Sequence, residues 1–247
     1  MKRFAIGDIH GGYLALKQVL DRINYDPAEH ILFFVGDYVD GWPESKQVID
    51  LLVKIKEENP SCVFIRGNHD QWMVDFILSS AAIAPNYWVN QGGKATLESY
   101  GAQIFQHMSD CQVVVNIPED HIEFFNETVL YHITEDNKGF VHGGYVDPRG
   151  LGYDEPEVYL WDRDTAYYIA SGASTDLNFI KAHDELYIGH TTTLMWGKVL
   201  PVSREGKYFN IDTGGGWGGK LTAIDIDSKE VFQSDFVKDL YPGVVGR

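Results

Sequence analysis

The first 70 residues alternate between short apolar runs and amphipathic segments. The apolar runs 4–6, 31–35 and 62–65 have the length and composition of buried β-strands. Apolar residues then recur at the i, i+3, i+4, i+7 spacing of an amphipathic helix, first over 16–23 and again over 48–55. Strand, polar loop and helix therefore follow one another repeatedly, which predicts an α/β fold.

Each of the three apolar runs leads directly into a polar loop. These loops are Gly7-Asp8-Ile9-His10-Gly11, Gly36-Asp37-Tyr38-Val39-Asp40 and Gly67-Asn68-His69-Asp70. In open α/β sheets, ligands bind outside the carboxyl ends of the strands, so we expect the three loops to converge at one site. A single loop of this kind is explained as a turn or, for the third, as a helix N-cap. Three loops that all carry Asp, His or Asn favour a functional site.

The segment 71–137 has a different pattern. Residues 72–78 are expected to be helical, and the turn-forming residues 91–93 precede another helical pattern. Residues 112–117 are apolar enough for a strand, but a helical turn packed on the core is equally compatible with them. We therefore predict a single domain over residues 1–247, with a mainly helical cap insertion around 71–137.

A β-type pattern returns after residue 137. Expected strands at 138–141 and 185–188 lead into His142-Gly143-Gly144 and Gly189-His190-Thr191. Further strands are expected at 208–211, 221–224 and 231–232. Glycine lets a backbone and a ligand approach each other closely, so two strand-end histidines beside glycine favour metal binding over a structural role.

Composition excludes several classes of function. The formal net charge of −16 argues against a nucleic-acid binder, although bound divalent cations would make the charge at a phosphate-processing site locally positive. Cys62 and Cys111 lie in apolar surroundings and are expected to be reduced core residues. No apolar run reaches the ~18 residues needed to span a bilayer, and no secretory signal precedes the first strand. We therefore expect a cytoplasmic protein without nucleic-acid or membrane partners.

Six side chains are candidate metal ligands because they combine imidazole, carboxylate and amide groups. They are Asp8, His10, Asp37, Asn68, His142 and His190. Three nitrogens with three oxygens suit Mn, Fe or Zn better than Ca or Mg, which favour oxygen ligands only. Six protein ligands are too many for one catalytic metal and fit two ions that share a carboxylate. Such a pair would acidify a bridging water into a hydroxide nucleophile.

Four further residues are candidates for proton transfer and for phosphate binding. His69 could protonate a leaving oxygen, and Asp40 could orient its imidazole. Arg66 and Arg163 could bind phosphate oxygens bidentately, although a surface ion pair would also explain either arginine. Arg66 directly precedes the third polar loop, which favours a role in the site.

Together these motifs resemble the calcineurin-like metallophosphoesterases. The matching elements are Gly-Asp-x-His-Gly, Gly-Asp-x-Val-Asp, Gly-Asn-His-Asp, His142-Gly-Gly, Gly-His190-Thr, Trp161-Asp162-Arg163 and Ile211-Asp212-Thr213-Gly214. Within the phosphoprotein phosphatase branch they are most similar to the bacterial and phage (lambda-type) serine/threonine protein phosphatases. The resemblance implies an α/β/β/α sandwich of two mixed β-sheets flanked by helices.

The resemblance also implies a role for each candidate residue. Asp8 and His10 would bind the first metal, Asn68, His142 and His190 the second, and Asp37 would bridge them. His69, paired with Asp40, would be the acid, and Arg66 and Arg163 would hold phosphate. The cofactors implied are two divalent ions, with Mn²⁺ first and Fe or Zn as alternatives.

The implied activity is a metal-dependent serine/threonine phosphatase that acts on a phosphorylated protein or a small phosphoester. Two alternatives stay open: a dinucleoside polyphosphate hydrolase that uses the same metals, and a phosphate-binding module without turnover. One departure matters, because the family usually continues Gly-Asp-x-Val-Asp with a phosphate-binding Arg and Gly. This chain has Gly41-Trp42 there, so the sequence leaves open what replaces the arginine.

Overall fold

A computed structural model describes residues 1–172 and 181–247 and contains, in these residues, two five-stranded sheets and one three-stranded sheet. The first sheet has the order β13-β12-β1-β2-β3, in which β1, β2 and β3 run parallel and the other pairs are antiparallel. Its strands are β1 (Lys2–Ile6), β2 (His30–Phe34), β3 (Val63–Phe64), β12 (Thr222–Asp225) and β13 (Val231–Gln233).

The second sheet has the same mixed character and the order β10-β11-β9-β8-β7. Strands β8, β9 and β11 run parallel, with antiparallel β7 and β10 at the edges. Its strands are β7 (Tyr131–Ile133), β8 (Lys138–Val141), β9 (Glu185–Ile188), β10 (Val202–Arg204) and β11 (Tyr208–Asn210).

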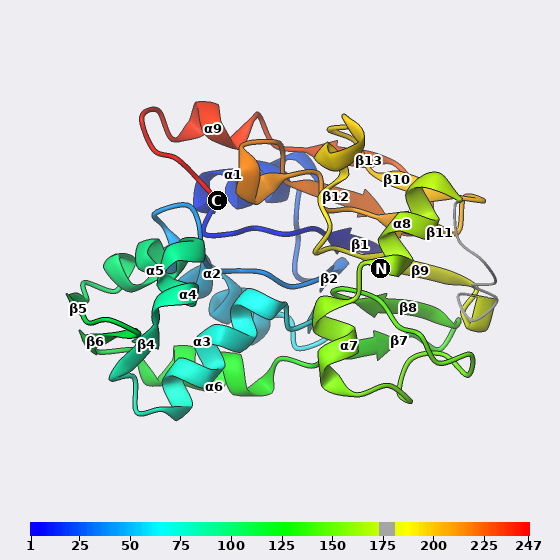
Figure 1. Cartoon of the computed structure of the whole chain (residues 1–247). Helices are drawn as coiled ribbons and strands as arrows, with labels where there is room; N and C mark the ends of the chain where they lie inside the picture. The colour runs from blue at the N-terminus through cyan, green and yellow to red at the C-terminus, as the bar shows by residue number, and fades with distance from the viewer. Residues whose placement is uncertain (173–180) are drawn as a thin grey trace.

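The two sheets pack face to face, and helices cover their outer faces (Figure 1). Side chains alternate along each strand, so Ala5 joins the core between the sheets while Phe4 and Ile6 pack under the helices. Phe33 and Phe140, from opposite sheets, stack with ring centroids 4.3 Å apart. The covering helices are α1 (Tyr13–Arg22), α2 (Ser45–Glu58), α7 (Pro156–Trp161), α8 (Asp164–Ser171) and α9 (Val237–Leu240). This arrangement confirms the predicted α/β/β/α sandwich.

The segment between the two halves, for which a mainly helical cap was expected, contains strands as well as helices. The strands form a three-stranded antiparallel sheet, β4-β6-β5 (Figure 1). Its elements are α3 (Asn68–Leu78), β4 (Ile83–Pro85), α4 (Asn86–Trp88), the π-helical η1 (Val89–Gly93), α5 (Lys94–Ser99), β5 (Gln103–Gln106), β6 (Asp110–Val114) and α6 (Glu119–Glu127). Strand β5 is mostly exposed and begins and ends with glutamine, so it carries no clear apolar alternation.

Two smaller expectations concern cysteines and membrane spans. Cys62 and Cys111 are buried and free. Among the helices in the described part of the chain, none combines the length and the apolar character required to cross a bilayer.

Candidate metal centre

The loops after the parallel strands of both sheets bring the candidate ligands together. Asp8, His10 and Asp37, which follow β1 and β2, offer ligand atoms within 4.8 Å of one another. Asp37 also forms such a group with His142 and His190, which follow β8 and β9. All five side chains are buried. Asp37 is thus the member that the two groups share.

Contacts of the Asp37 carboxylate place it between two imidazoles. Its Oδ2 lies 3.4 Å from His10 Nε2, and its Oδ1 lies 3.4 Å from His142 Nε2. Asn68, the sixth candidate, has its Oδ1 at 3.1 Å from the same His142 nitrogen. One oxygen of the Asp37 carboxylate thus faces each of the two groups.

Two of the histidine rings are oriented by backbone carbonyls. Nδ1 of His10 lies 3.1 Å from the Val39 oxygen and 3.0 Å from the Asp40 oxygen, and Nδ1 of His142 lies 2.8 Å from the Val35 oxygen. A carbonyl can only accept, so Nδ1 carries a proton in both rings and Nε2 is the nitrogen that faces the cluster. Metal-binding histidines are commonly held this way.

Several buried polar atoms of the cluster have no hydrogen-bond partner within the described residues. They are Asp8 Oδ1, Asp37 Oδ2, His69 Nε2 and His190 Nε2. An unpaired buried polar atom is costly, so four of them among neighbouring loops favour a bound ligand. The mixture of imidazole nitrogen and carboxylate oxygen fits divalent Mn, Fe or Zn, so the residues present fit a dinuclear metal centre.

The backbone at this site is unusual in two ways. His10, Asp37, Asp40 and His190 have φ between 51° and 72°, in the left-handed region that L-residues seldom adopt. Such conformations cluster at functional sites, where the surroundings enforce them. The flanking glycines allow the close approach, because a Cβ on Gly189 would lie 2.1 Å from Asp8 Oδ1.

Burial and neighbouring charges shift the proton affinities of the cluster. Burial lowers the pKa of His10 and of His190 well below the ordinary histidine value, which keeps both rings neutral and able to bind metal. Burial and the nearby Asp212 hold the pKa of Asp8 well above its usual range. Burial also raises the pKa of Asp37, but the His142 imidazolium outweighs it and holds that pKa well below its ordinary value. Asp37 is therefore the carboxylate that stays ionised.

His69 and Asp40 form a fully buried pair beside the metal ligands. His69 Nδ1 lies 2.7 Å from Asp40 Oδ2, and its unpaired Nε2 remains available to the cluster. The ring stands edge-on to His10, with centroids 5.1 Å apart. An imidazole oriented by a carboxylate at one nitrogen and free at the other has the arrangement of a general acid or base.

The inserted segment between the two halves supplies the other partners of Asp40. Trp88 Nε1 donates to Asp40 Oδ2 at 2.7 Å, and Thr96 Oγ1 donates to Asp40 Oδ1 at 2.7 Å. These contacts hold the carboxylate that orients His69. Sequence reasoning missed both residues, because a tryptophan and a threonine within helical patterns give no signal of chemistry.

The family of the chain follows from a comparison with family models. The model described as "Calcineurin-like phosphoesterase" matches residues 1–212, which is most of the sequence. The chain belongs to this family. It is therefore a metal-dependent phosphoesterase, and the buried histidine and aspartate groups are the candidate metal sites.

Relatives of this phosphoesterase include proteins named bis(5'-nucleosyl)-tetraphosphatase PrpE [asymmetrical]. One from Bacillus cereus strain 03BB102 is 26% identical over 239 residues, which cover 91% of this chain and 90% of that protein. One from Bacillus anthracis strain CDC 684 has the same identity and coverage.

Solved structures support the fold of the phosphoesterase. One provisionally described as a diadenosine tetraphosphatase has a TM-score of 0.62 at 17% identity and covers 94% of this chain and 92% of its own. A protein serine/threonine phosphatase from Saccharomyces cerevisiae has a TM-score of 0.57 at 12% identity, covering 96% of this chain and 79% of its own. At these identities the likeness concerns the fold alone.

Arg66, which was expected to bind phosphate, forms hydrogen bonds with the protein in this structure. Its Nε donates to Thr128 Oγ1 at 2.8 Å, its Nη1 to Gln71 Oε1 at 3.0 Å, and its Nη2 to the Phe125 oxygen at 3.0 Å. All three nitrogens thus bond to the protein itself. Four of the five guanidinium N–H groups are used in this way, so bidentate binding of phosphate would require Arg66 to give up at least one of these bonds. In this structure Arg66 connects Gln71 of α3 to the end of α6.

Arg163 is differently placed, at the rim of a cavity of about 420 Å³ that opens beside the metal ligands. Its Nη1 donates to Thr191 Oγ1 at 3.2 Å. We call this space the arginine cavity; it is lined by Arg163, His190, Thr192, Leu194, Met195, Trp217 and Arg247. Sequence reasoning did not single out Arg247, because nothing in its local sequence marks it.

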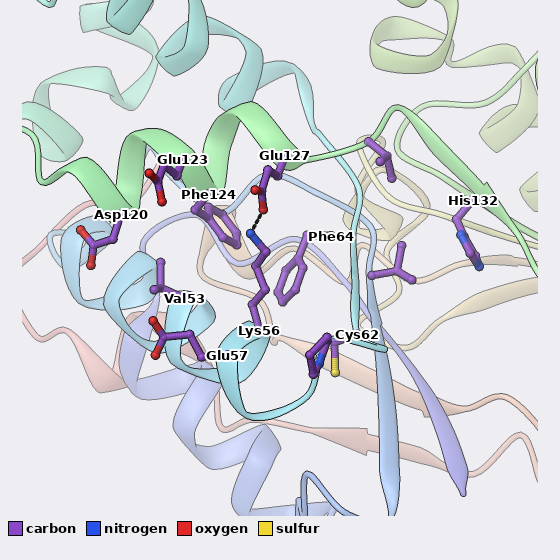
Figure 2. A pocket seen from close by; sticks show the side chains of 13 residues that line it. Val53, Lys56, Glu57, Cys62, Phe64, Asp120, Glu123, Phe124, Glu127 and His132 are labelled. Carbon is purple, nitrogen blue, oxygen red and sulfur yellow. Dashed lines mark ion pairs between the residues drawn. The ribbon is translucent and has the colours of Figure 1, made fainter.

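A second cavity, of about 510 Å³, lies away from the metal ligands between α2, α6 and the edge strand β3 (Figure 2). We call it the acidic cavity, because Glu57, Asp120, Glu123 and Glu127 line it against one lysine, Lys56. Lys56 forms an ion pair with Glu127 across the opening. None of the six candidate metal ligands contributes to this cavity.

Proposed function

We propose that this phosphoesterase hydrolyses dinucleoside polyphosphates at a dinuclear metal centre. The observation that carries the proposal is the shared carboxylate Asp37, which lies between two buried ligand groups with the His69–Asp40 pair beside it. A phosphate-binding module without turnover would not need that pair. The substrate class is supported by relatives that are similar over about nine-tenths of both chains and carry the tetraphosphatase name.

The proposed ligand sets follow the two groups. Asp8, His10 and Asp37 would hold one ion, and Asp37, Asn68, His142 and His190 the other. Two divalent ions held there, with Mn²⁺ as the first choice, would activate water and neutralise charge on the phosphoryl oxygens.

The remaining residues act on the substrate. His69 would protonate the leaving oxygen through Nε2, while Asp40 holds the proton on Nδ1 and keeps the ring in position. Arg163 would bind phosphate oxygens from the rim of the arginine cavity.

A second candidate, hydrolysis of phosphoserine or phosphothreonine, is favoured by the His69–Asp40 pair. A serine alkoxide is a poorer leaving group than a nucleotide phosphate, so its departure depends more strongly on a positioned acid. The complete hydrogen bonding of Asp40 therefore supports this activity independently of the relatives' names.

Parallel assays separate these candidates. Diadenosine tetraphosphate, a phosphoserine peptide and p-nitrophenyl phosphate would be offered to the Mn²⁺-loaded protein and to chelator-treated protein. We expect metal-dependent turnover, with the largest kcat/KM on diadenosine tetraphosphate. A preference for the phosphopeptide would replace the first candidate by the second, and no metal-dependent turnover of any substrate would contradict both.

A further inference from the structure

We propose that Arg247 is a substrate-binding residue that contacts a phosphate group at the metal centre; this inference rests on the proposed phosphoester chemistry of that centre. Its guanidinium Nη1 lies 3.5 Å from Nε2 of the candidate ligand His10. It lines the arginine cavity together with Arg163 and His190. Within the described residues neither arginine forms an ion pair.

The chain returns to the site after an exposed excursion. Residues 242–245 are exposed, and Val245 is 85% exposed, whereas Gly246 and Arg247 are half-buried. The backbone N–H of Arg247 donates to the Gly216 oxygen at 2.8 Å. In Figure 1 the red end of the chain turns back from α9 toward the centre of the molecule.

Trp42 and Gly246 hold this returning segment in place. Trp42 is buried and donates its indole N–H to the Gly215 oxygen at 2.8 Å. A Cβ built on Gly246 would lie 2.6 Å from the Gly216 oxygen and 2.7 Å from the Trp42 ring, so only glycine fits between them. The Arg247 guanidinium then stacks on Trp217, 5.1 Å from the ring centroid.

The side-chain stem of Arg247 uses the space that Gly41 leaves. Gly41 has φ +121°, and a Cβ built on it would lie 3.2 Å from Arg247 Cγ. A larger residue at position 41 would therefore meet both backbone strain and the arginine stem. The Gly41-Trp42 dipeptide thus accommodates Arg247, which supplies the cation that position 41 lacks.

The chemistry of this placement suits a phosphate. A guanidinium binds phosphate oxygens bidentately, and Arg163 offers a second one in the same cavity. In a chain with a formal net charge of −16, local cations are needed to bind a polyanion. Hydrogen bonds to charged groups contribute enough that the loss of one arginine should weaken phosphate binding by roughly 10- to 100-fold.

Calorimetric binding of inorganic phosphate to the Mn²⁺-loaded protein tests the role without turnover. We expect Arg247→Gln to weaken phosphate binding by about 10- to 100-fold, with an unchanged metal content by elemental analysis, and Arg247→Lys to keep part of the affinity. Arg149→Gln is the matched control, because Arg149 pairs with Asp147 and its side chain is 63% exposed.

Gly246→Val tests positioning, because it keeps the guanidinium and blocks the turn beside Trp42. We expect it to weaken phosphate binding in the natural chain and to add nothing in the Arg247→Gln background. Unchanged affinity in Arg247→Gln, loss of affinity in step with loss of metal, or full additivity of the two variants would overturn the inference. Arg247-dependent phosphate binding without hydrolysis of any substrate would instead contradict the proposed function and leave the role of Arg247 standing.

Discussion

The arginine cavity and the acidic cavity have similar volumes, about 420 and 510 Å³, and opposite chemistry. In the acidic cavity the charge of the lining lysine is neutralised, since Lys56 forms an ion pair with Glu127. The arginine cavity adjoins carboxylate and imidazole atoms without partners in the described residues, and among these residues neither of its two arginines forms an ion pair. The two cavities therefore differ less in size than in the buried polar atoms without hydrogen-bond partners, which adjoin the arginine cavity.

The strongest test of this contrast replaces one carboxylate beside each cavity. Asp37→Asn removes the charge shared by both ligand groups, so we expect loss of bound metal and of nearly all turnover. Glu123→Gln in the acidic cavity should leave both unchanged. Elemental analysis and steady-state kinetics measure the two effects. Two bound ions with full activity in Asp37→Asn would reject the shared-carboxylate assignment.

A pair of histidine variants makes the same comparison for proton transfer. His69→Asn should lower turnover of a phosphoserine peptide by about 10²–10⁴-fold and affect p-nitrophenyl phosphate less, because an aryl oxide leaves without an acid. His132→Asn, in the acidic cavity, should change neither rate. Equal losses on both substrates in His69→Asn would indicate that this residue serves metal or phosphate binding instead.

Metal removal should lower the stability of the protein only when the ligands beside the arginine cavity are intact. An ion that binds the folded chain at 100 times its dissociation constant stabilises it by about 2.7 kcal/mol. We therefore expect Mn²⁺ to raise the unfolding temperature of the natural chain and of Glu123→Gln, but not of Asp37→Asn. Calorimetric scans with and without chelator measure this difference, and an equal shift in all three proteins would place the stabilising ion elsewhere.

The smallest effect is expected from the ion pair across the acidic cavity. Lys56 and Glu127 keep 34% and 60% of their side-chain surface exposed, and such pairs contribute about 0–1 kcal/mol. Lys56→Met should thus change the free energy of unfolding by less than about 1 kcal/mol, without altering kcat or KM. A change in substrate specificity would show that the acidic cavity takes part in binding.

The sequence predicted the strands that end at the site better than the segment that supports it. Strands β8 and β9 coincide with the expected 138–141 and 185–188, because both are apolar and buried at their carboxyl ends. Strand β4 was missed, because Ile83–Pro85 is only three residues long and is too short for an alternating pattern to be recognised.

For the candidate site, too, local sequence patterns predicted only part of the structure. The six metal-ligand candidates were found because their residue types recur at strand ends, and the structure brings them together. The environment of Arg66 was not foreseen, because Phe125 and Thr128, two of its three partners, lie 59 and 62 residues away in sequence. Arg247 lies 237 residues from His10, a distance over which local pattern carries no information.

The ligand cluster around Asp37 is held by hydrogen bonds between residues that are far apart in sequence, which has a consequence for how the chain folds. The hydrogen bond from His190 N to Asp8 joins residues 182 apart in sequence, and the one between His142 and the Val35 oxygen joins residues 107 apart. Contacts of such separation form late, after the entropy of long loops has been lost. A complete ligand set therefore exists only once both sheets have docked. The metal ions would then stabilise the folded sandwich but would not initiate its folding. Metal uptake would therefore be the last step in forming the active protein.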